Sequence, residues 1–441
     1  MKRVKNGLKF RQPNNFLMDG GQFLTGTAGN FPCCSAFCAA VFCLGLFLNL
    51  IVPPTAAAEG DCTIAETAFQ VASKIRGLKD KKKVPCRLQN RKEVEKYLRS
   101  EISEKAPGER LKNEAVTFRL IGLIPWDYNY QEGLIQMYTD QLGGYYDSKK
   151  KYYAMADWMP AVMQLPIAVH ELTHALQDQH FDLDKLIDED RNSSDTMMAR
   201  SALVEGDATA VMIDYTKLQT GQGQLKDDPS VSGIMMQNIA GTMMTASLQQ
   251  APGSLQMLLI FPYISGLNFA HALLRTDGGY QGIDRAYRRP PQTTAEILHP
   301  DRYLNNSVVL KDPPDPLKGL PPEAADYNEV YSDSFGEFVV STWLSPGLMP
   351  VPASQVASGW AGDRLMLLRS PAAGKFICLW STIWIDEPAA KRFFDGVEKM
   401  LTARFGAAPV RSGDTAIFTA AHPLKVTVTR SGDSVMMSFV E

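Results

Sequence analysis

The sequence predicts an α+β fold with a mostly helical larger domain that contains a small β-hairpin, and a small C-terminal α+β domain. Three observations lead to this prediction. The chain has 441 residues, which favours two or three domains over a single core. Hydrophobic residues make up 45% and charged residues 21%, as is typical of a folded globular protein. Helical spacing of apolar residues dominates most of the chain, whereas short strand-like runs dominate after Pro352.

The first 58 residues are expected to direct export and not to belong to the fold. Basic residues at the start are followed by an apolar run over residues 36–52, and Ala56 and Ala58 occupy the positions that signal peptidase reads. An uncleaved anchor is the alternative, because the basic residues lie far from the apolar run and the run could just span a thin bilayer. We assign residues 1–58 to a signal peptide or an N-terminal membrane anchor. The protein is therefore expected in the periplasm or the extracellular space, and associated with the membrane if this segment is retained.

The cysteines are compatible with export. Four of the seven lie in the first 58 residues. Of the others, Cys62 and Cys86 could pair in an oxidising compartment and fix the mature N-terminus, whereas Cys378 is left alone.

The mature chain is predicted to divide into residues 59–350 and residues 351–441. In the first part, aromatic runs around a polar turn predict a β-hairpin over residues 143–155. Long helices are expected at about 160–179 and 195–220, and the apolar stretch 255–274 fits a buried core helix better than a membrane span.

The charge of the chain speaks against nucleic acid as a partner. The formal net charge is -3, and the basic stretch from Lys79 to Lys83 is short and interrupted by Asp80. Such a stretch is typical of a solvated helix face and not of a nucleic-acid interface.

His170 and His174 give the clearest chemical signal. They belong to the segment HELTH, and their spacing places both imidazoles on one face of a helix. Two imidazole nitrogens so placed can bind one Zn²⁺ at about 2.0–2.1 Å. Glu171 lies beside them, where it can accept a proton from zinc-bound water and not bind the metal itself. The alternative, two helix histidines bonded to backbone or water, is costly in a helix this apolar.

A catalytic zinc needs a third protein ligand, for which two residues compete. His180 has the spacing of metzincins, but the glycine turn of that pattern is missing, so a continuing helix points His180 away from the metal. Glu205 lies in a small and apolar helical segment, where a carboxylate without a cation is costly to bury. Gly206 is expected to let this helix approach the metal-binding helix closely. A buried ion pair is the alternative role of Glu205.

Two further carboxylates could support the site. Asp178 lies one helical turn beyond His174 and is expected to orient a ligand imidazole. Asp207 points elsewhere on its helix and is expected to support the site or to cap, and not to bind the metal.

Segments 170–183, 202–209 and 287–303 resemble a group of exported, largely uncharacterised gluzincin-type metallopeptidases, and segment 359–364 adds to the likeness. The resemblance covers most of residues 140–441, and the first two segments are its specific part. It implies a zincin-like catalytic domain in which Glu205 completes the metal site with His170 and His174. It implies no particular substrate.

The predicted function is hydrolysis of peptide bonds in peptides or proteins, with Glu171 as the base. The developing oxyanion needs a second donor, and His299 and Tyr303 are the candidates, although His299 could simply end a short helix. The hairpin with Tyr152 and Tyr153 precedes the metal-binding helix, where zincins place an edge strand that binds extended substrate. A plain packing hairpin is the alternative.

Two other functions compete with peptide hydrolysis. One is a non-peptide zinc amidase, and the other is an exported structural or binding protein with a stabilising zinc. A structural zinc usually has four protein ligands, whereas only three good ligands are visible beside Glu171. The sequence therefore favours the enzyme.

The leader assignment makes the first testable prediction. The mature N-terminus is expected to be Glu59, because cleavage follows Ala58. Mass spectrometry of the native protein measures this directly, and an intact leader would identify a membrane-anchored protein instead.

Overall fold

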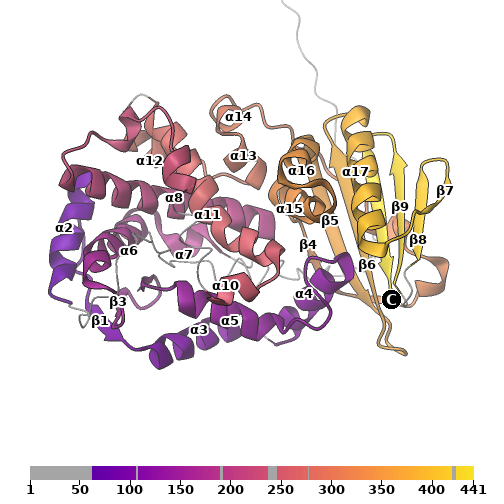
Figure 1. The fold of residues 1–441 in the computed structure, drawn as a ribbon, viewed down its shortest axis with the longest axis horizontal. Helices are drawn as coiled ribbons and strands as arrows, with labels where there is room; N and C mark the ends of the chain where they lie inside the picture. Colours follow the sequence, from indigo (N-terminus) through magenta and orange to yellow (C-terminus); the bar gives the residue numbers. More distant parts are fainter. Residues whose placement is uncertain (1–61, 106–107, 189–191, 237–245, 277, 420–423) are drawn as a thin grey trace, which may run out of the picture. The chain divides into compact units, whose positions relative to one another are not determined.

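The computed structural model describes residues 62–105, 108–188, 192–236, 246–276, 278–419 and 424–441 (Figure 1). The predicted leader lies outside these ranges. Within them, helices predominate and two sheets are present, so the predicted α+β class is confirmed.

The larger, N-terminal part is mostly helical. Its helices are α2 (Ile64–Arg76), α3 (Arg91–Lys105), α4 (Gly108–Ile121), α5 (Tyr130–Gln141), α6 (Ala161–Phe181), α7 (Leu183–Leu186), α8 (Ser194–Gln219), α10 (Ala246–Gln250), α11 (Gly253–Leu274), α12 (Tyr280–Arg288), α13 (Thr294–Leu298) and α14 (Pro300–Leu304). The two predicted long helices correspond to α6 and α8, within two residues at each end.

Helices α6, α8 and α11 form the centre of this part. α8 is buried on all sides over most of its length, which explains why its sequence shows little amphipathic pattern. α11 is long and apolar enough to cross a membrane, but 72% of its most apolar window is buried inside the protein. It thus has the burial expected of a core helix.

A three-stranded sheet lies against α6. Its strands β1 (Cys86–Gln89), β3 (Tyr152–Ala156) and β2 (Gly144–Asp147) follow one another in that order. β2 and β3 form the predicted antiparallel hairpin, and β1 pairs with β3 in parallel. Because β3 has a neighbour on both sides, the strand with Tyr152 and Tyr153 is central, and the hairpin's edge strand is β2. A Cys62–Cys86 disulfide joins the residues before α2 to β1.

The C-terminal part contains an antiparallel seven-stranded sheet in the order β4-β5-β6-β10-β9-β8-β7. Its strands are β4 (Asn328–Asp333), β5 (Trp360–Arg369), β6 (Phe376–Trp384), β7 (Val410–Ser412), β8 (Thr415–Thr419), β9 (Lys425–Ser431) and β10 (Ser434–Val440). Strand β4 precedes residue 351, where we expected this domain to begin.

Helices α15 (Gly336–Leu348), α16 (Pro350–Ala357) and α17 (Glu387–Phe405) accompany this sheet (Figure 1). α17 has clear start and stop signals in the sequence. The Asp386 side chain accepts a hydrogen bond from the Ala389 amide, and Gly406 ends the helix in the left-handed conformation. The apolar face of α17, including Phe393 and Leu401, is buried.

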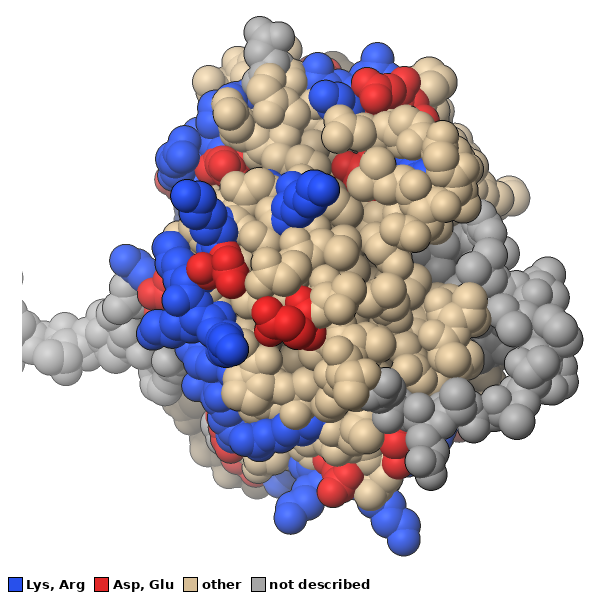
Figure 2. Space-filling model, turned by 90° about the vertical axis from the view of Figure 1, so that its left-hand side faces the viewer, with Lys and Arg blue, Asp and Glu red and all other residues tan. Residues whose placement is uncertain are grey.

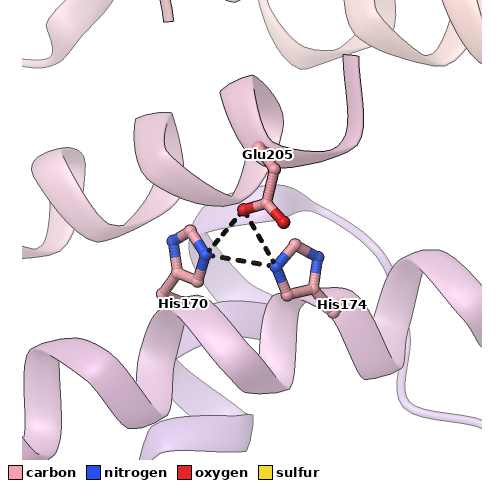
Figure 3. Close-up of side chains that lie close together, drawn as sticks. All are labelled: His170, His174 and Glu205. Carbon is pink, nitrogen blue, oxygen red and sulfur yellow. Dashed lines mark hydrogen bonds and ion pairs between the residues drawn. The ribbon is translucent and has the colours of Figure 1, made fainter. Parts of the chain in front are cut away.

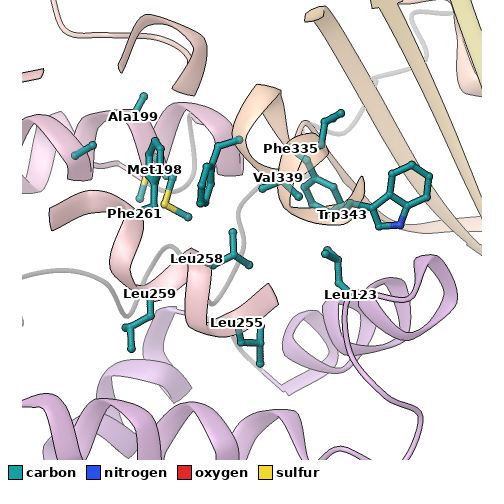
Figure 4. Close-up of a cluster of buried hydrophobic side chains, with 14 of the residues drawn as sticks. Leu123, Met198, Ala199, Leu255, Leu258, Leu259, Phe261, Phe335, Val339 and Trp343 are labelled. Atoms are coloured by element: carbon teal, nitrogen blue, oxygen red, sulfur yellow. The ribbon is translucent and has the colours of Figure 1, made fainter. Parts of the chain in front are cut away.

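The core is continuous from the helical part to the sheet. Figure 4 shows apolar side chains of α8 and α11 beside Phe335, Val339 and Trp343 from α15 and the residue before it. Asp363 of β5 fixes the start of α15, because its carboxylate accepts hydrogen bonds from the amides of Phe335 and Gly336. The indole N–H of Trp380 donates to the same carboxylate.

The surface seen in Figure 2 mixes both signs of charge, with acidic side chains among Lys and Arg. Lys79, Lys81, Lys82 and Lys83 are exposed, as expected, but they follow α2 in a loop and do not continue the helix. The amides of Lys81 and Lys82 donate to Gln179 Oε1 of α6, which fixes this loop.

Gly206 allows a close helix contact, but with a partner that we did not expect. A Cβ atom added at Gly206 would lie 2.1 Å from the backbone oxygen of Gly266 in α11. One added at Gly266 would lie 2.2 Å from the backbone oxygen of Ala202 in α8. The glycine therefore brings α8 against α11 and not against the metal-binding helix α6.

This contact leads to the second prediction. Gly206→Ala and Gly266→Ala are each expected to destabilise the protein by about 1–3 kcal/mol, because the new methyl group meets backbone that cannot move aside. Thermal unfolding measures the effect. Gly253→Ala, in the first turn of α11 with open space around its Cβ position, is the matched control and should leave the melting temperature nearly unchanged.

Candidate metal centre

His170, His174 and Glu205 converge in the interior of the helical part (Figure 3). The two histidines project from neighbouring turns of α6, and Glu205 reaches them from α8. His170 Nε2 lies 3.2 Å from Glu205 Oε2 and 3.1 Å from His174 Nε2. His174 Nε2 lies 3.5 Å from the same carboxylate oxygen. These side chains are at most 2% exposed.

The three atoms fit one metal ion. Ligand atoms that bind zinc tetrahedrally at about 2.0–2.1 Å lie about 3.3–3.4 Å from one another, close to the three separations above. Two imidazole nitrogens and one carboxylate oxygen are also the donor types of catalytic zinc sites. Among the residues that the structure describes, these three form one group of potential metal ligands whose donor atoms lie close enough to bind a single ion.

Electrostatics links these three residues even without a metal. Burial lowers the pKa of His170, and the hydrogen bond to Glu205 only partly opposes this effect. Burial also acts against a charge on His174, but the Glu205 carboxylate more than offsets it and raises the pKa of His174 to about 9. Burial opposes ionisation of Glu205, yet the two imidazoles, above all His174, lower its pKa. A metal ion that binds to a protonated His174 therefore has to displace its proton.

Gln177 fixes the orientation of His174, a role that we had assigned to Asp178. Its amide nitrogen donates to Val204 O at 3.1 Å and to Asp207 Oδ2 at 2.9 Å. Its amide oxygen must then face His174 Nδ1, 2.8 Å away, and accept that proton. This arrangement leaves the Nε2 lone pair of a neutral His174 directed at the cluster.

Asp178 serves another purpose. It accepts hydrogen bonds from the Tyr146 hydroxyl and from Lys151 Nζ, both at 2.8 Å. It therefore ties α6 to the β2–β3 hairpin. Asp178 lies one helical turn from His174, which suggests that it contacts the imidazole. The preceding residue, Gln177, makes this contact instead.

Asp207 extends the network to the N-terminal helix, so its expected supporting role is confirmed. Its Oδ1 lies 2.7 Å from Nε of Arg76, and Arg76 also pairs with Asp284 at 2.7 Å. The Tyr287 hydroxyl donates to Asp207 Oδ2 at 3.1 Å. Burial opposes the charge on Arg76, but Asp207 and then Asp284 more than offset it and raise its pKa. No local pattern in the sequence indicates that α2 contributes to this site.

Glu171 lies next to the metal cluster in sequence and is fully buried. Its Oε2 accepts the Tyr146 amide proton of the edge strand β2 at 3.1 Å. This hydrogen bond to a backbone amide restricts rotation of the Glu171 carboxylate. Tyr153 of β3 is close enough that burial and then the Glu171 carboxylate raise the pKa of its hydroxyl well above the usual value.

The remaining candidate residues lie outside the cluster. His180 is within hydrogen-bond distance of Lys79 O at 2.7 Å, which agrees with the expectation that it points away from the metal. His299 pairs with Glu337 at 2.8 Å, and Tyr303 donates to Arg289 O at 2.6 Å. The structure thus brings together three of the six predicted site residues, with Glu171 adjacent on α6, and does not bring His299 or Tyr303 to them.

Comparison with known proteins adds one finding. Residues 325–440 match a family model described as "Domain of unknown function (DUF8575)". Neither the search of curated proteins nor that of solved structures gives a significant match. The matched region corresponds to the seven-stranded sheet and its helices and includes none of the metal-cluster residues.

The role of Gln177 leads to the third prediction. Gln177→Met keeps the volume of the side chain but removes the acceptor for His174 Nδ1, so zinc affinity is expected to fall about 10–100-fold. Competition with a chromogenic chelator measures the affinity. Gln179→Met, on the partly exposed side of α6, loses only its contacts with the Lys81–Lys82 loop and should bind zinc like the unmodified protein. Equal affinities of the two variants would contradict the role of Gln177.

Proposed function

We propose that this protein is a zinc-dependent peptidase that acts outside the cytoplasm. The observation that carries the proposal is the convergence of His170 Nε2, His174 Nε2 and Glu205 Oε2 within hydrogen-bonding distance, with Glu171 on the same helix. Three protein ligands are the number in catalytic zinc sites, which keep one position for water or substrate.

When bound at such a site, zinc acts as a Lewis acid that makes water a stronger acid and polarises a carbonyl group. Glu171 supplies the base. It accepts the proton of the attacking water and returns it to the departing amine. The hydrogen bond from the Tyr146 amide keeps the carboxylate in one orientation for both transfers. This amide belongs to the edge strand β2, whose four residues are all buried, as in a packing hairpin.

The disulfide supports a location outside the cytoplasm. Disulfides persist in oxidising compartments and are rare where thiols are kept reduced. The Cys62–Cys86 bond lies close to the predicted cleavage site and fixes the start of α2, the helix that contributes Arg76. Formation of this disulfide would depend on export, and the disulfide fixes the helix that contributes Arg76 to the network around the metal site.

A stabilising zinc is the second candidate, and one observation favours it. The two imidazoles and the carboxylate are almost completely buried, as the ligands of structural sites often are. In that case metal removal would lower the melting temperature, and Glu171 would have no chemical role. The two candidates are separated by variants that retain the metal but lose the base.

The fourth prediction concerns this separation. Glu171→Gln keeps the shape and the acceptor for the Tyr146 amide but cannot accept a proton, so hydrolysis of casein-type substrates should fall by roughly 10²-fold or more. Its zinc content should equal that of the unmodified protein. Glu205→Ala should instead lose zinc, because two imidazoles alone bind the ion weakly, and activity should be lost as a consequence.

Metal content is measured by elemental analysis and activity by release of labelled peptide. His180→Gln is the matched control on α6 and should keep both metal and activity, since His180 contacts Lys79 and not the cluster. A Glu171→Gln variant with full metal content and undiminished hydrolysis would remove the main support for the peptidase. Loss of zinc in His180→Gln would instead favour a metzincin-like ligand set.

A further inference from the structure

A cavity lies apart from the metal cluster, beside α11, α15 and α16. Its volume is about 980 Å³, and none of the metal-cluster residues lines it. Apolar side chains form much of its wall, among them Leu123, Leu298, Phe338 and Trp343. Met257 and Val351 also line it and are 40% and 67% exposed, so the cavity is reached from solvent. Cavities of this size and character hold small organic ligands.

One buried glutamate belongs to the wall of this cavity. Glu337, in the first turn of α15, lines the cavity although its side chain is only 3% exposed. Its Oε1 lies 2.8 Å from Nε2 of His299, also a lining residue. Its Oε2 is buried and has no hydrogen-bond partner among the residues that the structure describes. Such an oxygen is costly to bury unless a donor reaches it.

The charges around the cavity restrict what this donor can be. Two of the protein's basic side chains near Glu337 already have partners: His299 contacts Oε1, and Arg302 Nη1 donates to Ser358 O. Burial raises the pKa of Glu337, and His299 and then Arg302 counteract this effect. A second cation at Oε2 would favour the ionised carboxylate further, whereas an anionic ligand would be repelled by it.

We propose that this cavity binds an amine with an apolar body, whose ammonium group donates to Glu337 Oε2 while the body lies against Phe338 and Trp343. This role also accounts for His299, which lies outside the metal cluster: it holds the Glu337 carboxylate in position through Oε1. The proposal does not depend on the peptidase function, because the two sites share no residue.

The test compares three compounds that share one apolar body: phenylbutylamine, phenylbutanol and phenylbutyrate. Titration calorimetry on the purified protein should rank them amine, alcohol, carboxylate, with the amine at least about tenfold tighter than the alcohol. A chelator should leave this ranking unchanged, which separates the cavity from the metal cluster. Equal or tighter binding of phenylbutyrate, or no binding of phenylbutylamine, would overturn the proposal.

Two variants place the binding in this cavity. Glu337→Gln should remove the preference for the amine over the alcohol, whereas Glu329→Gln, an exposed glutamate on β4, should keep it. Ser341→Trp places a large side chain in the lining and should abolish binding of all three compounds. Circular dichroism checks that each variant is folded. If Glu337→Gln does not fold, the ranking on the unmodified protein and the effect of Ser341→Trp decide. An unchanged preference in folded Glu337→Gln contradicts the proposal.

Discussion

The fold of the helical part depends on placing one almost completely buried carboxylate, Glu205, next to two imidazoles. A buried carboxylate without compensation would be prohibitively costly, so α6 and α8 have to pack in the single register that brings His170 and His174 to it. Close packing of α8 on its other side, through Gly206 against α11, keeps that register. A hydrophobic core alone would tolerate several registers, whereas the cluster tolerates one.

The charges around this cluster alternate, because Glu205 and Asp207 of α8 each lie next to a basic side chain. Glu205 is compensated by the imidazoles, and Asp207, two residues further along α8, is compensated by Arg76. The neutral amide of Gln177 stands between the two acidic residues and accepts from one side while it donates to the other. A charged residue at this position would unbalance one of the two pairs, which explains why an uncharged side chain with both a donor and an acceptor lies there.

The sequence predicted what depends on local spacing. The HELTH segment had to place two imidazoles on one face of a helix, and Glu205 stood out because it is a carboxylate in an apolar run. What remained hidden depends on contacts between distant segments. Arg76 reaches Asp207 from a helix far away in the chain, and no local pattern indicates this. Gly206 indicates a close contact between helices, but a glycine in the sequence does not indicate which helix is the neighbour. The peptidase function, zinc itself and the leader remain predictions.

The Arg76 network also bears on the order in which the molecule forms during synthesis. Arg76 emerges first, Asp207 much later and Asp284 later still, yet all three meet in one ion-pair network. Until Asp207 is available, the buried guanidinium has no opposite charge beside it, so α2 can dock only after α8 has been made. Bonding of Cys62 to Cys86 requires only residues made early, and it can hold the end of this helix next to β1 in the meantime. A nascent chain would thus carry a tethered but undocked α2 until Asp207 has been made.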